Sequence, residues 1–306
     1  MKISGFTLVR NGTAFDYPYL ESLRSLLPLV DELIVNVGKG DDDTLEQIQK
    51  FATQEGQGKV TYFESDWQLD QPEKKRGGLI LSEQTNAALS RCTGDWCFYL
   101  QADEVLHEAD LPILRKTLDR IHSDPRVEGL LFQYHHFYGS FDVIQESRST
   151  YRREVRAVRR NVHPKSIGDA QSFRKSDGSK LTVILGGGRI FHYGWVRKPE
   201  AMKEKTFFMD QLYHGDPTKK NLAQRTPHTG DNYRYKRFWG LKPFQGSHPA
   251  VMRERIETKG WHWDLKNSPF KLSFKDSKKI VLDSVEKLTG VRLFEYQSYR
   301  ILRKLF

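Results

Sequence analysis

Two adjacent carboxylates, Asp103 and Glu104, closely follow the apolar run WCFYL at residues 96–100. A short run of this composition is typical of a buried strand, so both carboxylates are expected in a loop at its carboxyl end. Oxygen ligands in such a loop suit a hard divalent cation, and Mg²⁺ often binds through one or two carboxylates plus substrate phosphates. The alternative is a helix with an acidic first turn, which the helix dipole favours. The spacing alone leaves both interpretations open.

The elements that would position these carboxylates alternate between strand and helix signals. Short apolar runs predict strands at residues 3–9, 32–37, 60–63, 96–100 and 128–134. Leucine-rich segments with helical spacing predict helices at residues 15–30, 44–54, 79–91 and 111–121. This alternation indicates an α/β fold, a mainly parallel sheet flanked by helices. Such sheets bind ligands beyond the carboxyl ends of their strands, here residues 10–11, 38–43 and 101–104.

The pattern changes after residue 150. Strands are expected at residues 153–159 and 181–192, with a polar loop at 167–178, a helix at 197–212 and an irregular loop at 214–247. Two terminal helices are predicted at 276–288 and 291–306. Each carries an apolar seam: Val281, Val285 and Leu288 on the first, and Phe294, Ile301, Leu302 and Leu305 on the second.

Composition narrows the class of protein. The 306 residues are 38% hydrophobic and 29% charged, which excludes a disordered chain. No run approaches the ~18–20 apolar residues of a spanning helix, and residues 1–20 contain no long apolar region of a secretory signal. Two cysteines, Cys92 and Cys97, cannot form a disulfide framework. A cytoplasmic location is therefore expected.

The net charge of +10 is unevenly distributed. Residues 197–306 contain 24 Lys and Arg against 12 Asp and Glu, whereas the first 196 residues carry a net −2. A basic segment attracts phosphate on nucleic acid, anionic lipid or a phosphorylated ligand. A solvated basic surface is the structural alternative.

The run GDWCFYLQADE at residues 94–104 resembles the strand and DxD-type metal motif of family-2 glycosyltransferases, which have the Rossmann-like GT-A fold. Asp103 matches the family's metal ligand. Gln101 replaces the family's first carboxylate, and the resemblance implies that Gln101 and Ala102 contact the nucleotide-sugar donor. FHYGW at residues 191–195 resembles a signature of a bacterial subgroup in which the histidine completes the metal site. The resemblance implies that Asp103 and His192 bind Mn²⁺ or Mg²⁺. Trp195 would stack on a sugar ring or belong to the core.

Other segments follow in the family's order and extend the implied donor site. TLVRN at residues 7–11 resembles the first strand end, GKGDDDT at 38–44 the second, and KRGG at 75–78 a basic element near the diphosphate. The implied donor-binding residues of these three segments are Thr7, Val9, Arg10, Asn11, Lys39, Asp41, Asp43, Lys75 and Arg76. Asp169 matches the family's general base; alternatively, it caps a short helix at residues 170–175.

The resemblance implies a hexosyltransferase that moves a sugar from a nucleotide-diphosphate donor, with UDP as the expected nucleotide, to an acceptor hydroxyl with inversion. Its expected partners are a carbohydrate or lipid-linked acceptor of cell-surface polysaccharide or glycolipid synthesis. The predicted organisation is a catalytic domain at 1–225 and a basic, loop-rich and helical region at 226–306. The basic region either touches the inner, anionic membrane surface or packs on the catalytic domain.

Two other functions compete with this interpretation. A sugar-nucleotide nucleotidyltransferase normally needs a glycine-rich N-terminal loop, and residues 3–12 contain only Gly5 and Gly12. A nucleic-acid-binding protein would use the basic region with its tryptophans. The acidic strand ends of the first half oppose a phosphate backbone there, so no nucleic-acid partner is expected.

Overall fold

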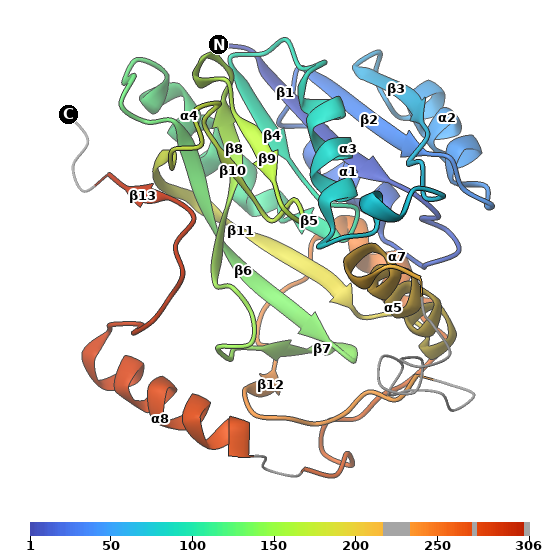
Figure 1. The fold of residues 1–306 in the computed structure, drawn as a ribbon, viewed down its shortest axis with the longest axis vertical. Helices are drawn as coiled ribbons and strands as arrows, with labels where there is room; N and C mark the ends of the chain where they lie inside the picture. Colours follow the sequence, from blue (N-terminus) through green and yellow to red (C-terminus); the bar gives the residue numbers. More distant parts are fainter. Residues whose placement is uncertain (217–232, 271–273, 303–306) are drawn as a thin grey trace.

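An eleven-stranded sheet organises the computed structural model, which describes residues 1–216, 233–270 and 274–302 (Figure 1). The strand order is β12-β7-β6-β8-β4-β1-β2-β3, and β11 joins at β6 and also pairs with β5 and β13. The α/β class predicted from the sequence is confirmed. The predicted domain boundary at residues 225–226 lies outside the described residues.

The first half of the chain is a parallel sheet with helical crossovers. Its strands pair in parallel because each is followed by a helix that returns the chain to the same edge. The strands are β1 (Ile3–Val9), β2 (Glu32–Gly38), β3 (Val60–Ser65) and β4 (Trp96–Tyr99). The helices are α1 (Tyr19–Leu26), α2 (Thr44–Gln54), α3 (Leu79–Leu89) and α4 (Leu111–His122), with short 3₁₀ turns η1 (Pro72–Lys74) and η2 (Glu108–Asp110).

The second half mixes parallel and antiparallel pairs. β8 lies between β4 and β6 and is antiparallel to both, while β6 and β11 run parallel over most of their length. The strands are β5 (Glu104–Leu106), β6 (Gly129–Tyr138), β7 (Ser140–Gln145), β8 (Arg153–Arg159), β11 (Thr182–Trp195), β12 (Leu241–Pro243) and β13 (Arg300–Ile301). A separate hairpin pairs β9 (Lys165–Ile167) with β10 (Ser172–Arg174). The remaining helices are η3 (Arg160–Val162), α5 (Pro199–His214), η4 (Ala250–Met252), α7 (Arg253–Glu257) and α8 (Phe274–Thr289).

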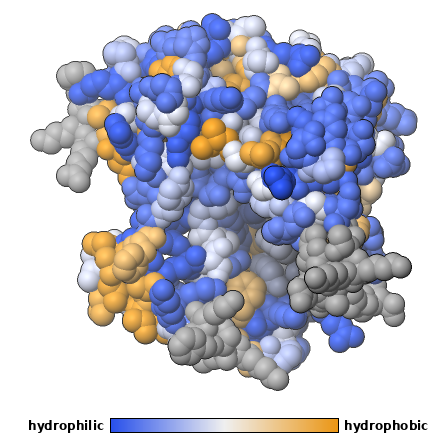
Figure 2. All heavy atoms as spheres, in the orientation of Figure 1, coloured by the Kyte–Doolittle hydropathy of each residue, from blue (hydrophilic) through white to orange (hydrophobic). Residues whose placement is uncertain are grey.

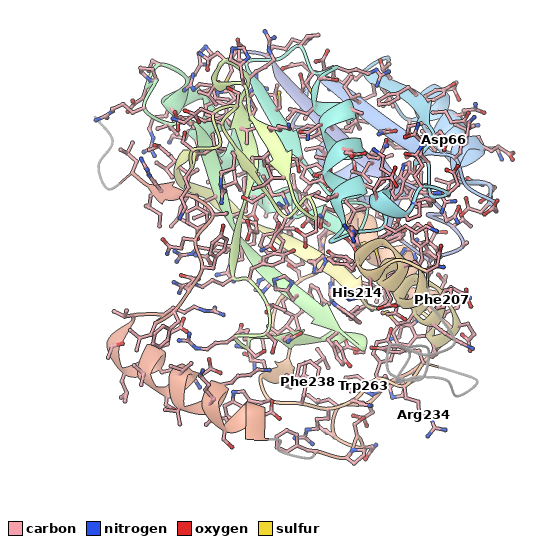
Figure 3. All side chains as sticks on the ribbon, in the orientation of Figure 1. Asp66, Phe207, His214, Arg234, Phe238 and Trp263 are labelled. Carbon is pink, nitrogen blue, oxygen red and sulfur yellow. The ribbon has the colours of Figure 1, made fainter. Side chains whose placement is uncertain are left out.

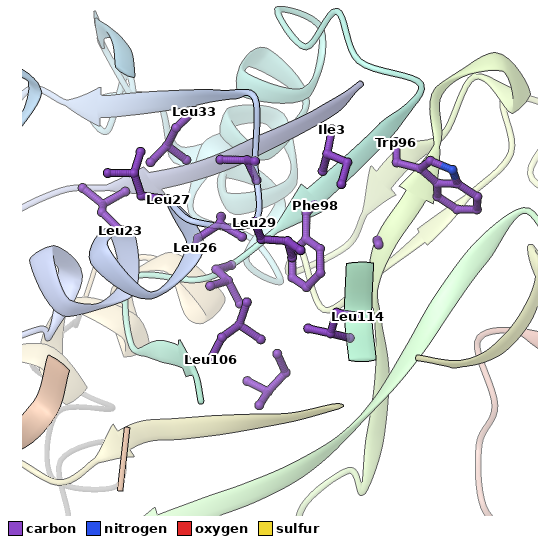
Figure 4. Packing of buried hydrophobic residues seen from close by; sticks show 14 of the residues in the cluster. Ile3, Leu23, Leu26, Leu27, Leu29, Leu33, Trp96, Phe98, Leu106 and Leu114 are labelled. Carbon is purple, nitrogen blue, oxygen red and sulfur yellow. The ribbon is translucent and has the colours of Figure 1, made fainter. Parts of the chain in front are cut away.

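The core lies on both faces of the sheet because its central strands are apolar at successive positions. One face packs against α1, α2 and α4, with Leu26, Phe98 and Leu114 among the buried side chains (Figure 4). The other face packs against α3 and the β9–β10 hairpin, where Phe6 and Tyr99 contact Phe173. The helices therefore fix the strand ends from both sides.

The C-terminal region differs from its prediction. No helix covers residues 291–302: Gly290 has φ +70°, which ends α8, and the chain then extends until β13 pairs with β11. Leu305 of the predicted seam lies outside the described residues. The seam on α8 does not pack inward, since Val281 and Leu288 are exposed. The helix expected at 170–175 is also wrong, because residues 172–174 form β10, so Asp169 caps no helix there.

The helices of the described residues include none with the length and apolar character needed to cross a bilayer.

Candidate active site

A cleft of about 540 Å³ opens at the carboxyl ends of β1 and β4, with further walls from β11 and α5. Its position is the one that parallel sheets use for ligands. Predicted donor, metal and base residues from four distant segments line it together: Val9, Arg10, Gln101, Ala102, Asp103, Asp169, His192 and Trp195. The fold therefore brings these eight side chains to one place.

Other predicted donor residues lie outside this lining. Thr7 is buried in β1, and Arg76 is exposed on its loop. Asn11, with φ +51°, accepts a hydrogen bond through Oδ1 from the backbone N–H of Asp41 at 3.0 Å. That bond joins the loops after β1 and β2.

The other residues outside the lining contact neighbouring groups. The backbone carbonyl oxygen of Lys39 accepts a hydrogen bond at 2.7 Å from Nε of Arg10, which does line the cleft. Asp43 accepts a hydrogen bond from Gln47, one turn into α2. Lys75 forms an ion pair with Asp216 at 2.7 Å.

Asp103 is buried beside two cations that sequence reasoning missed. Its Oδ2 lies 3.6 Å from Nζ of Lys205 on α5 and 3.8 Å from Nη2 of Arg197. Burial raises the pKa of Asp103, but His192, Lys205 and Arg197 together outweigh burial and hold it below its usual range. Burial and the nearby Arg197 lower the pKa of Lys205 to about 7, against the raising effect of Asp103. Asp103 is therefore ionised at neutral pH.

His192 presents a lone pair toward the other oxygen of Asp103. Its Nε2 lies 3.7 Å from Oδ1 of Asp103. Burial lowers the pKa of His192 to about 4, despite the nearby carboxylate, so the ring is neutral at pH 7. The contact is thus between a carboxylate and a neutral imidazole, a combination of acceptors that a cation completes.

A second histidine fixes the tautomer of the first. Nε2 of His136 lies 2.7 Å from the carbonyl oxygen of Tyr151 and must donate to it. Burial lowers the pKa of His136 to about 3, so its Nδ1 carries no proton and accepts from Nδ1 of His192 at 2.9 Å. His192 therefore keeps Nε2 unprotonated. An outer acceptor that fixes the tautomer and orientation of a histidine is a common feature of metal sites.

The glycine of the HYGW segment makes room for this arrangement. A Cβ on Gly194 would lie 2.5 Å from Nε2 of His192 and 3.1 Å from Oδ2 of Asp103. His192 and Gly194 occupy the same face of β11 because they are two residues apart. The imidazole therefore lies over a position that only glycine leaves open.

Glu104, the second carboxylate of the motif, does not face the cleft. It is fully buried and accepts two hydrogen bonds from Arg156 of β8, at 2.7 and 2.8 Å. Tyr134 donates to Glu104 Oε1 at 2.9 Å, and the Gln101 backbone N–H to Oε2 at 3.1 Å. Glu104 thus holds the loop that presents Asp103.

Asp169 and Tyr213 of α5 form another part of the cleft wall. The hydroxyl of Tyr213 donates to Oδ2 of Asp169 at 2.8 Å. Gly78, with φ +71°, allows close packing here, because its Cβ would lie 2.9 Å from Cβ of Asp169. The backbone of the KRGG loop therefore packs directly against Asp169 in the cleft wall, at Gly78.

Aromatic residues without a local sequence signal line the cleft beside Arg10. Arg10 lies over the rings of Phe208 and Trp67, at 5.1 and 6.0 Å from their centroids. The buried indole N–H of Trp67 has no hydrogen-bond partner among the described residues. The two rings are tilted by 35° to each other, and together they support the guanidinium of Arg10 at the edge of the cleft.

No protein-family model and no curated protein matches this sequence. Among solved structures, the chain is similar to S. aureus TarS, with TM-score 0.38 and 14% identity over 74% of this chain. It is also similar to the mannosyltransferase PcManGT from Pyrobaculum calidifontis in complex with GDP-Man and Mn²⁺, with TM-score 0.36 and 15% identity over 53% of this chain. A third is glucosyl-3-phosphoglycerate synthase from Mycobacterium tuberculosis with Mn²⁺, UDP and phosphoglyceric acid, with TM-score 0.29 and 24% identity over 45% of this chain. The matches cover 42%, 45% and 43% of those chains, respectively.

Proposed function

We propose that this protein is a glycosyltransferase that moves a sugar from a nucleotide-diphosphate donor to an acceptor hydroxyl with the help of a divalent cation. The observation that carries the proposal is the convergence of ionised Asp103 and the lone pair of His192 in a cleft at the carboxyl ends of parallel strands. Asp169 and Trp195 line the same cleft. The resemblance of the QADE and HYGW segments to family-2 glycosyltransferases supports the same function.

The metal-ligating atoms that Asp103 and His192 offer fit Mn²⁺ or Mg²⁺. Asp103 and His192 lie 3.7 Å apart, so one ion with bonds of about 2.1 Å reaches both. The described residues contain no group of three or more His, Cys, Asp or Glu side chains arranged for a metal. The other ligands would be diphosphate oxygens and water, as is usual for Mg²⁺. When bound, the ion supplies positive charge to the departing diphosphate.

The chain's own residues would then divide the remaining work. Arg197 places positive charge beside Asp103, and Lys205 adds to it when protonated, near the negative charge that develops on the leaving group. Arg10 and Trp67 would hold the base of the nucleotide, and Trp195 would stack on the sugar. The nucleotide we expect is UDP.

Asp169 is proposed as the general base. Tyr213 holds its Oδ2, and the other oxygen would take the proton of the attacking acceptor hydroxyl. A positioned base is worth about 10²–10⁴ in rate. A single displacement of this kind inverts the anomeric centre.

The acceptor is proposed to be a carbohydrate or a lipid-linked saccharide of cell-surface polysaccharide or glycolipid synthesis. The protein would then work in the cytoplasm and touch the inner membrane surface. Exposed apolar side chains beyond α8 support this contact, since Figure 2 shows an apolar patch where α8 lies in Figure 1. Leu288, Phe294 and Tyr296 are 87%, 89% and 79% exposed, and Lys278 and Lys287 are exposed on the same helix.

A thermal-shift screen tests the proposed donor site. Sugars carried by UDP, GDP, dTDP and CDP are compared with Mn²⁺ and with EDTA. A ligand at 100 times its dissociation constant stabilises the fold by about 2.7 kcal/mol. We expect one nucleotide to give a metal-dependent shift that Asp103→Asn abolishes and Asp119→Asn, an exposed control on α4, preserves. Absence of any metal-dependent shift contradicts the proposal.

A further inference from the structure

A second cavity of about 770 Å³ lies between β6, the loop after β7 and α8. Its volume is within the range of ligand clefts. Seven arginine or lysine side chains and three carboxylates line it, an excess of four positive charges. Phe238, labelled near β12 in Figure 3, forms part of its wall.

Four of the cations lack a carboxylate partner among the described residues: Arg153, Arg189, Arg237 and Lys287. The others are neutralised, since Arg152 and Arg292 pair with carboxylates of residues 286–295 and Lys242 with Glu146. The buried Nε of Arg153 has no hydrogen-bond partner within the same set of residues. Unpaired cations facing one cavity favour an anionic ligand.

One of these cations is held in place by a neutral histidine. Burial and the adjacent Arg189 lower the pKa of His135 to about 4. His135 is therefore uncharged at pH 7 and accepts a hydrogen bond from Nη1 of Arg189 at 3.1 Å. The guanidinium is oriented without loss of its charge.

Aromatic rings alternate with these cations. The guanidinium of Arg237 lies 5.4 Å from the ring centroid of Phe270. Tyr134, Tyr151 and Trp239 also line the cavity, and the indole N–H of Trp239 is fixed by Asp283 at 2.8 Å. Flat rings beside cations can hold sugar faces while the cations bind carboxylate or phosphate oxygens.

This cavity adjoins the candidate active site. Tyr151 lines both spaces, and its carbonyl oxygen binds His136, which in turn contacts His192. The second cavity therefore shares Tyr151 as a common wall with the candidate active site. The carboxylates of Asp283 and Glu286 on the outer wall oppose a continuous nucleic-acid backbone.

We propose that the second cavity binds an anionic saccharide, carrying carboxylate or phosphate groups, as the acceptor of the transfer reaction. The role as acceptor rests on the proposed function; the binding of an anionic saccharide rests on the cavity alone. The cations would fix the acid groups, and the aromatic wall would direct the terminal hydroxyl past Tyr151.

Calorimetric titration at low ionic strength tests the proposal with three matched probes. These are tetragalacturonate, maltotetraose phosphorylated at its 6-hydroxyls, and neutral maltotetraose. We expect one of the anionic probes to bind at least about tenfold more tightly than the neutral one, because each charged contact is worth more than a neutral hydrogen bond. The preferred probe identifies the acid group as carboxylate or phosphate.

Two variants and one control locate the binding. Arg153→Gln with Arg237→Gln should weaken the preferred probe at least about tenfold. Lys287→Gln with Arg237→Gln keeps the test available if the buried change prevents folding. Arg120→Gln, an exposed arginine on α4, should change nothing. Equal binding of charged and neutral probes, unchanged binding in the variants, or tighter binding of a random oligonucleotide overturns the proposal.

The same proteins separate this proposal from the proposed function. Asp103→Asn should abolish the thermal shift with the nucleotide sugar and leave saccharide binding unchanged. The two double variants should weaken saccharide binding and leave the thermal shift with the nucleotide sugar unchanged. If no nucleotide sugar binds but the anionic probe does, the cavity stands as a saccharide site and the transferase proposal fails.

Discussion

The strand-end site around Asp103 and the α8 region distribute polarity in opposite ways. At the strand ends, charged groups are buried: Glu104 and Arg156 are fully enclosed by the sheet, and Asp103 is surrounded by Lys205, Arg197 and His192. In the α8 region, the carboxylates face the protein, while apolar side chains and the lysines Lys278 and Lys287 face solvent. Arg148, Arg152 and Arg292 hold Asp283, Glu286 and Glu295 on the inner side, while Leu288 and Phe294 point outward.

The contrast shows two uses of ion pairs. Burying an ion pair costs desolvation free energy. Removing one partner costs far more, because the other charge stays buried without a counter-charge, so the pair holds a loop in one geometry. The α8 pairs keep partial contact with solvent, since the side chain of Glu286 is 23% exposed, so they cost less desolvation free energy and determine how the helix docks. The strand-end pair therefore orients a site, whereas the α8 pairs attach a helix whose outer side remains available.

Among the tests of this contrast, Glu104→Gln should have the largest effect on stability. The change leaves Arg156 as an unpaired buried charge, and we expect the free energy of unfolding to fall by about 3–5 kcal/mol. Glu286→Gln in the α8 network should cost less, because this carboxylate is 23% exposed and its arginine partners keep Asp283 and Glu295. Urea titration measures both. Equal losses would show that the two networks do not differ in the way their burial indicates.

A pH titration of stability follows from Glu154, next to Arg156 on β8. Burial raises its pKa from 4.5 to about 7, and its Oε2 is buried without a hydrogen-bond partner among the described residues. The protonated carboxyl is therefore favoured in the folded state. Its stabilisation is complete below pH ~4.5 and is lost as pH rises through ~7, a change of about 3 kcal/mol.

Glu154→Gln should remove that part of the pH dependence, since the amide does not titrate. Chemical unfolding between pH 4.5 and 8 compares the two proteins. Parallel stability curves would show that Glu154 titrates normally.

The support of the cleft by His136 predicts a smaller effect. His136→Phe removes the acceptor that fixes the tautomer of His192, so we expect metal affinity to fall about 10–100-fold. His135→Phe is the matched control, because the neighbouring ring faces Phe191 and Phe244 and makes no hydrogen bond to His192. Titration of Mn²⁺ in the presence of the bound nucleotide measures the change. Equal affinity in both variants would remove His136 from the site.

The smallest effect on stability is expected at the outer surface of α8. Leu288→Ser with Phe294→Ser should change the free energy of unfolding by less than about 0.5 kcal/mol, because both side chains are exposed. The same change should reduce flotation with vesicles of equimolar phosphatidylcholine and phosphatidylglycerol. Ser284→Ala on the same helix is the control. Undiminished flotation of the double variant contradicts membrane contact through this patch.

The sequence predicts the first half of the fold well because its elements are locally consistent. β1 and α2 begin and end at the predicted residues, since an apolar run buries both faces of a central strand and an amphipathic helix buries one continuous face. The terminal seam at 291–306 had helical spacing too, but Gly290 and the φ of +59° at Phe294 direct the chain away from a helix. Spacing describes which residues could share a face and does not include these backbone conformations.

The candidate site was predictable only where a motif carried it. Asp103, His192 and Trp195 belonged to recognisable segments, and their proposed roles stay predictions. Lys205, Arg197 and His136 had no such signal, because a buried cation or a supporting histidine is defined by its partner across the fold. Arg197, for example, donates to the carbonyl oxygen of Phe15, 182 residues away. Such partnerships appear only once β11 and α5 are placed.

The position of β8 between β4 and β6 has a consequence for synthesis of the chain. β4 is complete at residue 99, but the neighbour that covers its free edge spans residues 153–159. During translation, the apolar WCFY strand, which is buried in the final fold, therefore keeps one unpaired edge while about fifty more residues are made. Asp103 waits longer still, until β11 supplies His192. A chaperone would protect the nascent chain most in this interval, because the edge that β8 later covers is open to pairing with another chain.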